Sequence, residues 1–152
     1  MDVITVLLID SHDGVRRVLA QRLDTQPDFC VVGQTASPFA GIEMADRLRP
    51  DIIVFDCNTP GAYVAERVRQ ISRACPTAHV VVFTSYLTPA EEQAYLSAGA
   101  SAAMLKGLGF SEFCDRLRAI TPLASGNGRA PTVTGRRPAQ SSPESGAGRP
   151  TA

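Results

Sequence analysis

Tryptophan is absent from this chain of 152 residues, and aromatic residues together make up only 6% of it. A hydrophobic core is therefore predicted to be aliphatic, and 44% hydrophobic residues over this length suffice to build one. Uninterrupted apolar runs are of strand length, as at Val80–Phe83, whereas a membrane-spanning helix needs about 18 residues. Fifteen basic residues balance fifteen acidic ones, which argues against a protein that coats nucleic acid or an anionic membrane.

Zinc-binding cysteine motifs are also missing, and nothing in the first residues suggests export. No two of Cys30, Cys57, Cys75 and Cys114 have Cys-x-x-Cys spacing. The first residues, Met-Asp-Val-Ile, carry no basic region of the kind that opens a signal peptide. We therefore expect free thiols in a reducing compartment and a cytoplasmic location.

The composition changes near residue 122. The segment 122–152 is rich in Pro, Gly, Ser and Thr, and its sizeable apolar side chains are Leu123 and Val133. Such a segment cannot bury enough surface to offset a backbone ordering cost of about 1–2 kcal/mol per residue. We expect one folded domain over residues 1–121 and a disordered tail over residues 122–152.

Two periodicities alternate over the first 121 residues. Continuous apolar segments, typical of strands buried on both faces, are predicted at 3–9, 29–32, 51–55, 80–83 and 102–105. Apolar residues at helical spacing follow each of them, and capping signals at Ser37-Pro38 and at Thr88–Glu91 mark two helix starts. Five strands alternating with five helices indicate an α/β fold, doubly wound around a five-stranded parallel sheet.

Polar residues stand at the carboxyl ends of four of these strands, where open parallel sheets bind ligands. Asp10 and Asp56 offer oxygen ligands for Mg²⁺, and the backbone carbonyl of Asn58 is a third candidate unless it only bonds the turn. A carboxylate can also attack phosphorus. Lys106 could neutralise the transferred group, and the Thr84 hydroxyl could bond its oxygens. Together these residues describe a phosphoryl-accepting site.

Four segments resemble, in order and spacing, those of response-regulator receiver domains, the phospho-acceptor modules of two-component signalling. They are VLLID (6–10), RPDIIVFDCNTPG (49–61), VVVFTS (80–85) and AGASAAMLK (98–106). The resemblance implies a flavodoxin-like (βα)5 fold and phosphorylation of Asp56 by a histidine kinase or a phosphotransfer protein. It also implies that Thr84 and Lys106 couple the phosphate to a shift of the face that runs from strand four to helix five.

The spacing is most similar to receivers of helix-turn-helix regulators, but residues 122–152 contain no apolar helices that could form that output domain. We therefore expect a single-domain response regulator, a switch and not an enzyme. It would signal through contacts with a downstream protein target in a phosphorelay, without binding DNA or a membrane directly. Homodimer formation is open.

Two departures from the family favour an alternative. Ser11 stands where the family usually has a second acid that commonly binds the metal, so Mg²⁺ is expected to bind weakly. Ala103 stands where the family has an aromatic switch residue, so no ring can flip there. The alternative is a pseudo-receiver, a phosphorylation-independent interaction module. Of the neighbouring polar residues, we expect His12 to be exposed and uninvolved and Asp13 to cap the following helix.

Overall fold

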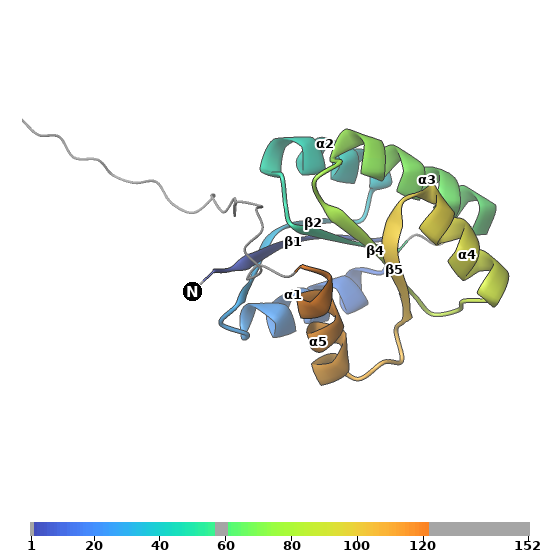
Figure 1. Ribbon diagram of the computed structural model, residues 1–152. Helices are drawn as coiled ribbons and strands as arrows, with labels where there is room; N and C mark the ends of the chain where they lie inside the picture. The colour runs from blue at the N-terminus through green and yellow to red at the C-terminus, as the bar shows by residue number, and fades with distance from the viewer. Residues whose placement is uncertain (1, 57–60, 122–152) are drawn as a thin grey trace, which may run out of the picture.

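The computed structural model describes residues 2–56 and 61–121, which form five strands and five helices in strict alternation (Figure 1). The strands are β1 (Ile4–Asp10), β2 (Phe29–Thr35), β3 (Ile52–Asp56), β4 (His79–Thr84) and β5 (Ala100–Leu105). The helices are α1 (Asp13–Asp24), α2 (Pro38–Leu48), α3 (Gly61–Ala74), α4 (Pro89–Ala98) and α5 (Phe110–Ile120).

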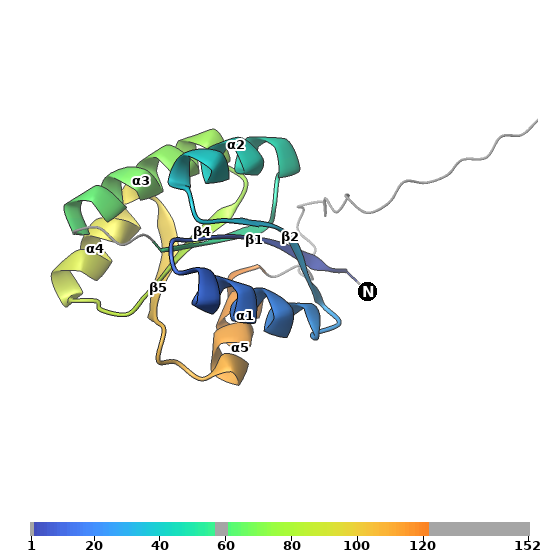
Figure 2. The same cartoon turned by 180° about the vertical axis from the view of Figure 1, so that it is seen from behind.

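The strands form one parallel sheet in the order β2-β1-β3-β4-β5. Helices α1 and α5 cover one face of it, and α2, α3 and α4 cover the other (Figures 1 and 2). Because β1 connects to β2 on one side and lies beside β3 on the other, the direction of winding changes between β1 and β3. In this doubly wound topology, the crevice at the carboxyl ends of those two strands is where ligands bind.

Side chains of successive strand residues enter two separate hydrophobic clusters. Leu7, Ile53 and Phe55 pack under α2, α3 and α4, whereas Val6 and Val54 pack under α1 and α5. This alternation follows from the period of two along a strand. Covering both faces makes β3 fully buried along its length, which explains why its sequence is a continuous apolar run that ends in an aspartate.

Local sequence signals determine where two of the helices begin. The Ser37 hydroxyl accepts a hydrogen bond from the backbone N–H of Ala40 at the start of α2. Thr88 and Glu91 form a reciprocal capping box at the start of α4. Gly41 lets α2 lie against β1, because a Cβ at this position would be 2.4 Å from the side chain of Ile9.

The expected flavodoxin-like (βα)5 fold is confirmed. The core is largely aliphatic, as expected, but Phe55 and Phe113 are among its largest fully buried side chains. Cys30, Cys75 and Cys114 are free thiols, and within residues 2–56 and 61–121 no helix is long and apolar enough to cross a membrane. The expected tail over 122–152 lies outside the described residues.

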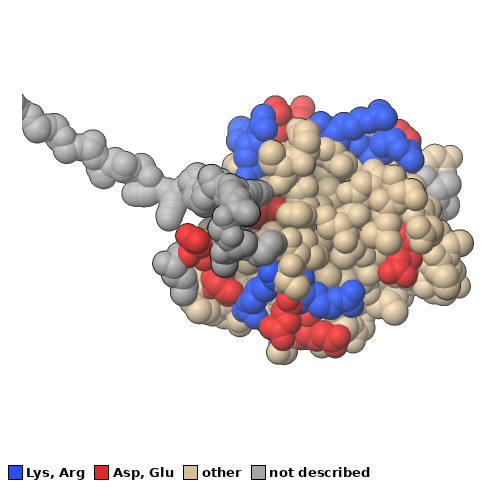
Figure 3. Space-filling view, in the orientation of Figure 1, with Lys and Arg blue, Asp and Glu red and all other residues tan. Residues whose placement is uncertain are grey.

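Charged side chains line the rims near α2, α3 and α5, and a broad surface between these rims carries few of them (Figure 3).

Candidate functional site

Two carboxylates lie side by side at the edge of the sheet because of the strand register. Asp10 is the last residue of β1 and Asp56 the last of β3, and the two residues are partners in the parallel ladder. Neighbouring strands are about 4.8 Å apart, so this register brings the two side chains together. Asp10 is 5% exposed and Asp56 is 7% exposed. The sequence prediction that these two acids share one site agrees with this placement.

Lys106 bridges both carboxylates. It directly follows β5, where its backbone N–H donates to the carbonyl of Thr84, 2.8 Å away. Its Nζ lies 2.9 Å from Oδ2 of Asp10 and 2.8 Å from Oδ2 of Asp56. Lys106 is also the only lysine in a chain with fifteen basic residues. A compact ammonium with three donors suits a position between two carboxylates better than a planar guanidinium does.

The charges of this trio do not cancel, because two carboxylates face one ammonium. Burial raises the pKa of Asp56, and the contact with Lys106 offsets that increase only in part. Burial alone would lower the pKa of Lys106, but its hydrogen bonds to Asp56 and Asp10 outweigh burial and leave the pKa raised. With both acids ionised, the two carboxylates and one ammonium carry a net negative charge, which attracts a cation.

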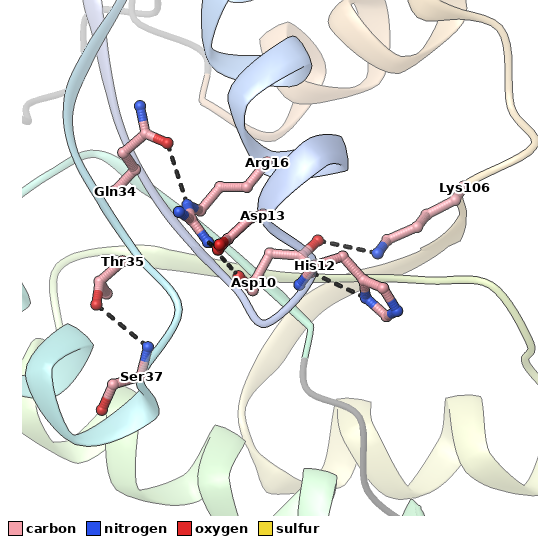
Figure 4. Close-up of polar contacts among 8 residues, drawn as sticks. All are labelled: Asp10, His12, Asp13, Arg16, Gln34, Thr35, Ser37 and Lys106. Atoms are coloured by element: carbon pink, nitrogen blue, oxygen red, sulfur yellow. Dashed lines mark hydrogen bonds and ion pairs between the residues drawn. The ribbon is translucent and has the colours of Figure 1, made fainter.

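His12 belongs to this site, contrary to the expectation that it is uninvolved. Its backbone N–H donates to Oδ1 of Asp10 at 2.8 Å, and its Nδ1 lies 3.4 Å from the same oxygen. The side chain is half-exposed, so the expectation of exposure was correct. Because His12 is the N-cap residue of α1, the turn between β1 and α1 directs its ring back toward Asp10 (Figure 4). Sequence spacing alone does not reveal this orientation.

Arg16 is a buried residue that sequence analysis missed. It is 8% exposed and reaches from α1 to the end of β1, where Nη1 donates to the carbonyl of Asp10 at 2.8 Å (Figure 4). The same nitrogen donates to Asp13, and Nε donates to Gln34 on β2. The spacing of Asp13 and Arg16 in a helix favours an ion pair, but the contacts with β1 and β2 depend on the tertiary fold.

The prediction that Asp13 caps α1 is wrong. Asp13 is the first helical residue, and the N-cap position belongs to His12, whose side chain makes no capping hydrogen bond. The Asp13 carboxylate instead accepts from Arg16 at 2.8 Å, and this hydrogen bond lowers the pKa of Asp13. Arg16 therefore draws the carboxylate along the helix surface and takes it away from a capping role.

The remaining predicted site residues have different surroundings. Thr84 ends β4 at the same edge of the sheet, and its hydroxyl donates to the carbonyl of Tyr86, 3.4 Å away. Ala103 is buried in the cluster under α4, together with Tyr95. Tyr86 is 73% exposed. Asn58, whose backbone carbonyl is a predicted metal ligand, lies outside the described residues.

The donors at this site fit a divalent cation. One ligand atom each from Asp10, His12 and Asp56 lies within 4.8 Å of the other two. Carboxylate oxygens are ligands for Mg²⁺ and other hard cations, and imidazole nitrogen is a ligand for transition-metal ions. Lys106 holds the Oδ2 atoms of both acids, whereas His12 lies beside Oδ1 of Asp10. Oδ1 of Asp10 therefore takes no part in the ion pair with Lys106.

Comparison with known families gives one match that covers most of the chain. The profile described as "Response regulator receiver domain" matches residues 6–118. The chain is 35% identical over 118 residues to the transcriptional regulatory protein LiaR of Bacillus subtilis, covering 78% of this chain and 56% of LiaR. It is 33% identical over 122 residues to the nitrate/nitrite response regulator NarL of Escherichia coli, covering 80% of this chain and 55% of NarL. The chain thus spans a little over half the length of these relatives.

Solved structures show the same fold. The response regulator domain of Thermotoga maritima CheB matches with a TM-score of 0.67 and 26% identity, covering 78% of this chain and 96% of that domain. A two-component response regulator of the LuxR family from Aurantimonas matches with a TM-score of 0.71 and 26% identity, covering 78% of this chain and 85% of that one.

Proposed function

This chain belongs to the response-regulator receiver family, and we propose that Asp56 is the residue that accepts its phosphoryl group. Receiver domains are signalling switches and not classical enzymes. The observation that carries the proposal is the pairing of Asp10 and Asp56 in register, bridged by the only lysine of the chain. A purely structural strand end does not need two buried acids and a shared ammonium.

In the proposed reaction, a carboxylate oxygen of Asp56 attacks the phosphorus of a phosphohistidine or a small acyl phosphate. The new P–O bond forms as the bond from phosphorus to the leaving nitrogen or oxygen breaks, and Asp56 becomes an aspartyl phosphate. The leaving group keeps the electron pair of the broken bond. Lys106 lies 2.8 Å from Asp56, so its ammonium is placed to neutralise charge on the transferred phosphoryl oxygens.

Thr84 is proposed to respond to the phosphoryl group. Its hydroxyl rests on the carbonyl of Tyr86, and the 3.4 Å distance makes this a weak hydrogen bond that a stronger acceptor can replace. A phosphoryl oxygen is such an acceptor. Turning the hydroxyl toward Asp56 would release the carbonyl of Tyr86 and alter the loop between β4 and α4. This would transmit the signal to the face that runs from β4 to α5. The movement would not need an aromatic side chain at position 103, where this chain has alanine.

Asp10 and Asp56, with the backbone carbonyl of Asn58, are proposed to hold a divalent cation. When bound, this cation supplies positive charge that stabilises the negative oxygens of the phosphoryl group. Ser11 offers no carboxylate where the family usually has a second acid, so we propose that Mg²⁺ binds weakly here. One missing carboxylate at an effective dielectric near 20 is worth roughly 1–4 kcal/mol.

The proposed partners are a histidine kinase or phosphotransfer protein as donor and a downstream protein as target. The surface between the charged rims, which carries few charged side chains, is suited to a protein partner and not to the phosphate backbone of DNA (Figure 3). The curated relatives include transcriptional regulators, but this chain matches only a little over half of their length. Free thiols at Cys30, Cys75 and Cys114 support a reducing, cytoplasmic setting.

Intact-protein mass spectrometry after incubation with acetyl phosphate and Mg²⁺ tests the acceptor. We expect one phosphoryl adduct on the wild type and none on Asp56→Asn, which keeps the shape of the side chain but lacks the nucleophilic carboxylate. If the wild type forms no adduct but Ser11→Asp does, the chain is a pseudo-receiver that lost its metal site. If neither forms an adduct, Asp56 is not a phospho-acceptor.

A further inference from the structure

The loop after β1 offers an imidazole next to the position where a carboxylate is missing. Ser11 supplies no carboxylate, and the next residue, His12, turns its ring toward Asp10 (Figure 4). The donors described at the site are therefore two carboxylates and one imidazole nitrogen. Compared with two adjacent acids, the pair Ser11 and His12 offers an imidazole nitrogen in place of a carboxylate oxygen. This changes the kind of donor as well as the charge.

Distances at the site agree with coordination of one ion by these donors. Two atoms that are each about 2.0–2.2 Å from an ion, at an angle of about 90–110°, lie about 2.8–3.6 Å apart. Nδ1 of His12 lies 3.4 Å from Oδ1 of Asp10, within that range. All three ligand atoms lie within 4.8 Å of one another, whereas two ligands on opposite sides of an ion are about 4.0–4.4 Å apart. The outer limit of 4.8 Å exceeds the opposite-side distance by a few tenths of an ångström and the distance at about 90–110° by about 1.2 Å or more, so side-chain movements of this size bring all three onto one ion.

The surroundings of His12 leave its Nδ1 available. The side chain is half-exposed, so the ring can turn without disturbing the core, and Nε2 can keep its proton. The backbone N–H of His12 holds Oδ1 of Asp10 at 2.8 Å, which fixes the orientation of the carboxylate beside the ring. Lys106 pairs with the Oδ2 atoms of both acids, whereas His12 lies beside Oδ1 of Asp10.

The chemistry of the donors determines the class of ion. Mg²⁺ is a hard ion that prefers oxygen ligands and gives up its water reluctantly. Imidazole nitrogen favours divalent transition-metal ions such as Co²⁺ and Zn²⁺, and their affinity for mixed nitrogen and oxygen sites is higher. We propose that Asp10, His12 and Asp56 form a site for a divalent transition-metal ion of the Co²⁺ and Zn²⁺ class, in preference to Mg²⁺. This site rests on the proposed function, because it is the cation site beside the proposed phospho-acceptor.

Titration of the full chain with Co²⁺ tests the proposal, because the visible absorption of this ion reports on its ligands. We expect one strong site per chain that keeps more than half of its Co²⁺ in about a hundredfold excess of Mg²⁺. His12→Ala and the more conservative His12→Gln should each weaken Co²⁺ binding at least tenfold and change Mg²⁺ binding by less than about twofold. His79→Gln is the matched control, since His79 is the other histidine and begins β4, at the opposite end of the sheet. We expect this variant to bind Co²⁺ like the wild type.

Three results would overturn the proposal. The first is Co²⁺ affinity that is unchanged in folded His12→Ala and His12→Gln. The second is loss of Co²⁺ to an equal concentration of Mg²⁺. The third is an intense near-ultraviolet band from thiolate bound to cobalt, which would assign the ion to a cysteine.

The outcomes separate this proposal from the phospho-acceptor itself. A phosphoryl adduct that forms with Mg²⁺ equally well in His12→Ala, without any preference for Co²⁺, keeps Asp56 as the acceptor and removes the transition-metal site. Co²⁺ binding that depends on His12, without an adduct in any metal, keeps the metal site and removes the acceptor.

Discussion

Replacement of Lys106 by methionine is expected to destabilise the fold strongly at neutral pH. The ammonium lies 2.8 and 2.9 Å from two carboxylates that are 7% and 5% exposed, so its removal leaves both acids buried without their shared counter-ion. Breaking a buried ion pair by removing one partner costs about 3–5 kcal/mol. Repulsion between two charges 4 Å apart is about 4 kcal/mol at an effective dielectric of 20, which is the same magnitude. We therefore expect Lys106→Met to lose about 3–5 kcal/mol, a large part of the typical stability of a domain.

The pH dependence of this loss follows from the raised pKa of Asp56. Burial raises this pKa in the wild type, and removal of the ammonium raises it further. A carboxyl group whose pKa is raised in the folded state destabilises the fold progressively as the pH rises from its unfolded pKa to the raised value, and the full penalty is present above that value. The loss in Lys106→Met should therefore be full at pH 7–8 and smaller near pH 4.5, where one carboxyl group takes up a proton.

Urea unfolding followed by far-ultraviolet circular dichroism measures the effect in a chain that has no tryptophan. Arg69→Met is the matched control, because its ion pair with Glu66 is exposed and should be worth less than about 1 kcal/mol. Lys106→Met combined with Asp56→Asn should recover most of the loss, since a single carboxylate remains. A loss below about 1 kcal/mol at pH 7, or one that is equal at pH 4.5 and pH 8, would refute the reasoning.

Three further predictions concern the scaffold. Thr88→Ala removes the side chain that accepts at the start of α4 and should lower the free energy of unfolding by about 1 kcal/mol, measured by urea unfolding. Gly41→Val should cost at least about 1–3 kcal/mol, because a Cβ there would be 2.4 Å from Ile9; thermal unfolding equal to the wild type would contradict the close contact. The hydrogen bond from Arg118 lowers the pKa of Asp28, so this acid stabilises the fold above its unfolded pKa of about 3.9 and the effect is lost as the pH falls through the folded value. Asp28→Asn should therefore cost about 0.5–1 kcal/mol at pH 7 and progressively less in acid as the pH falls through the folded pKa, and a cost independent of pH would argue against the ion pair.

Local signals allowed much of the fold to be predicted from the sequence. The apolar runs at the five strands, the helical periodicity between them and the caps at Ser37 and Thr88 all correspond to elements of the structure. These features are local, because the apolar pattern of a strand and the capping of a helix depend on residues a few positions apart. The acids at the strand ends could be predicted for the same reason, since a parallel sheet places all carboxyl ends on one edge.

The surroundings of His12 and Arg16 could not be predicted in this way. Arg16 reaches the carbonyl of Asp10 and the side chain of Gln34, which is 18 positions away in the sequence. His12 lies only two positions from Asp10, but the direction of its ring follows from the conformation of the turn between β1 and α1, which the sequence pattern did not indicate. The assignment of Asp13 as a cap failed because its carboxylate accepts a hydrogen bond from the buried Arg16 and not from the first backbone N–H groups of the helix.

The sequence by itself determined the alternation of strands and helices, the aliphatic core and the presence of two acids, a threonine and a lysine at strand ends. Only the tertiary structure decided that Asp10 and Asp56 are partners in the ladder, that Lys106 bridges them and that His12 adds an imidazole beside them. The reason is physical. Secondary structure arises from interactions within one segment, whereas the distance between two side chains from different strands is set by register and packing across the whole sheet.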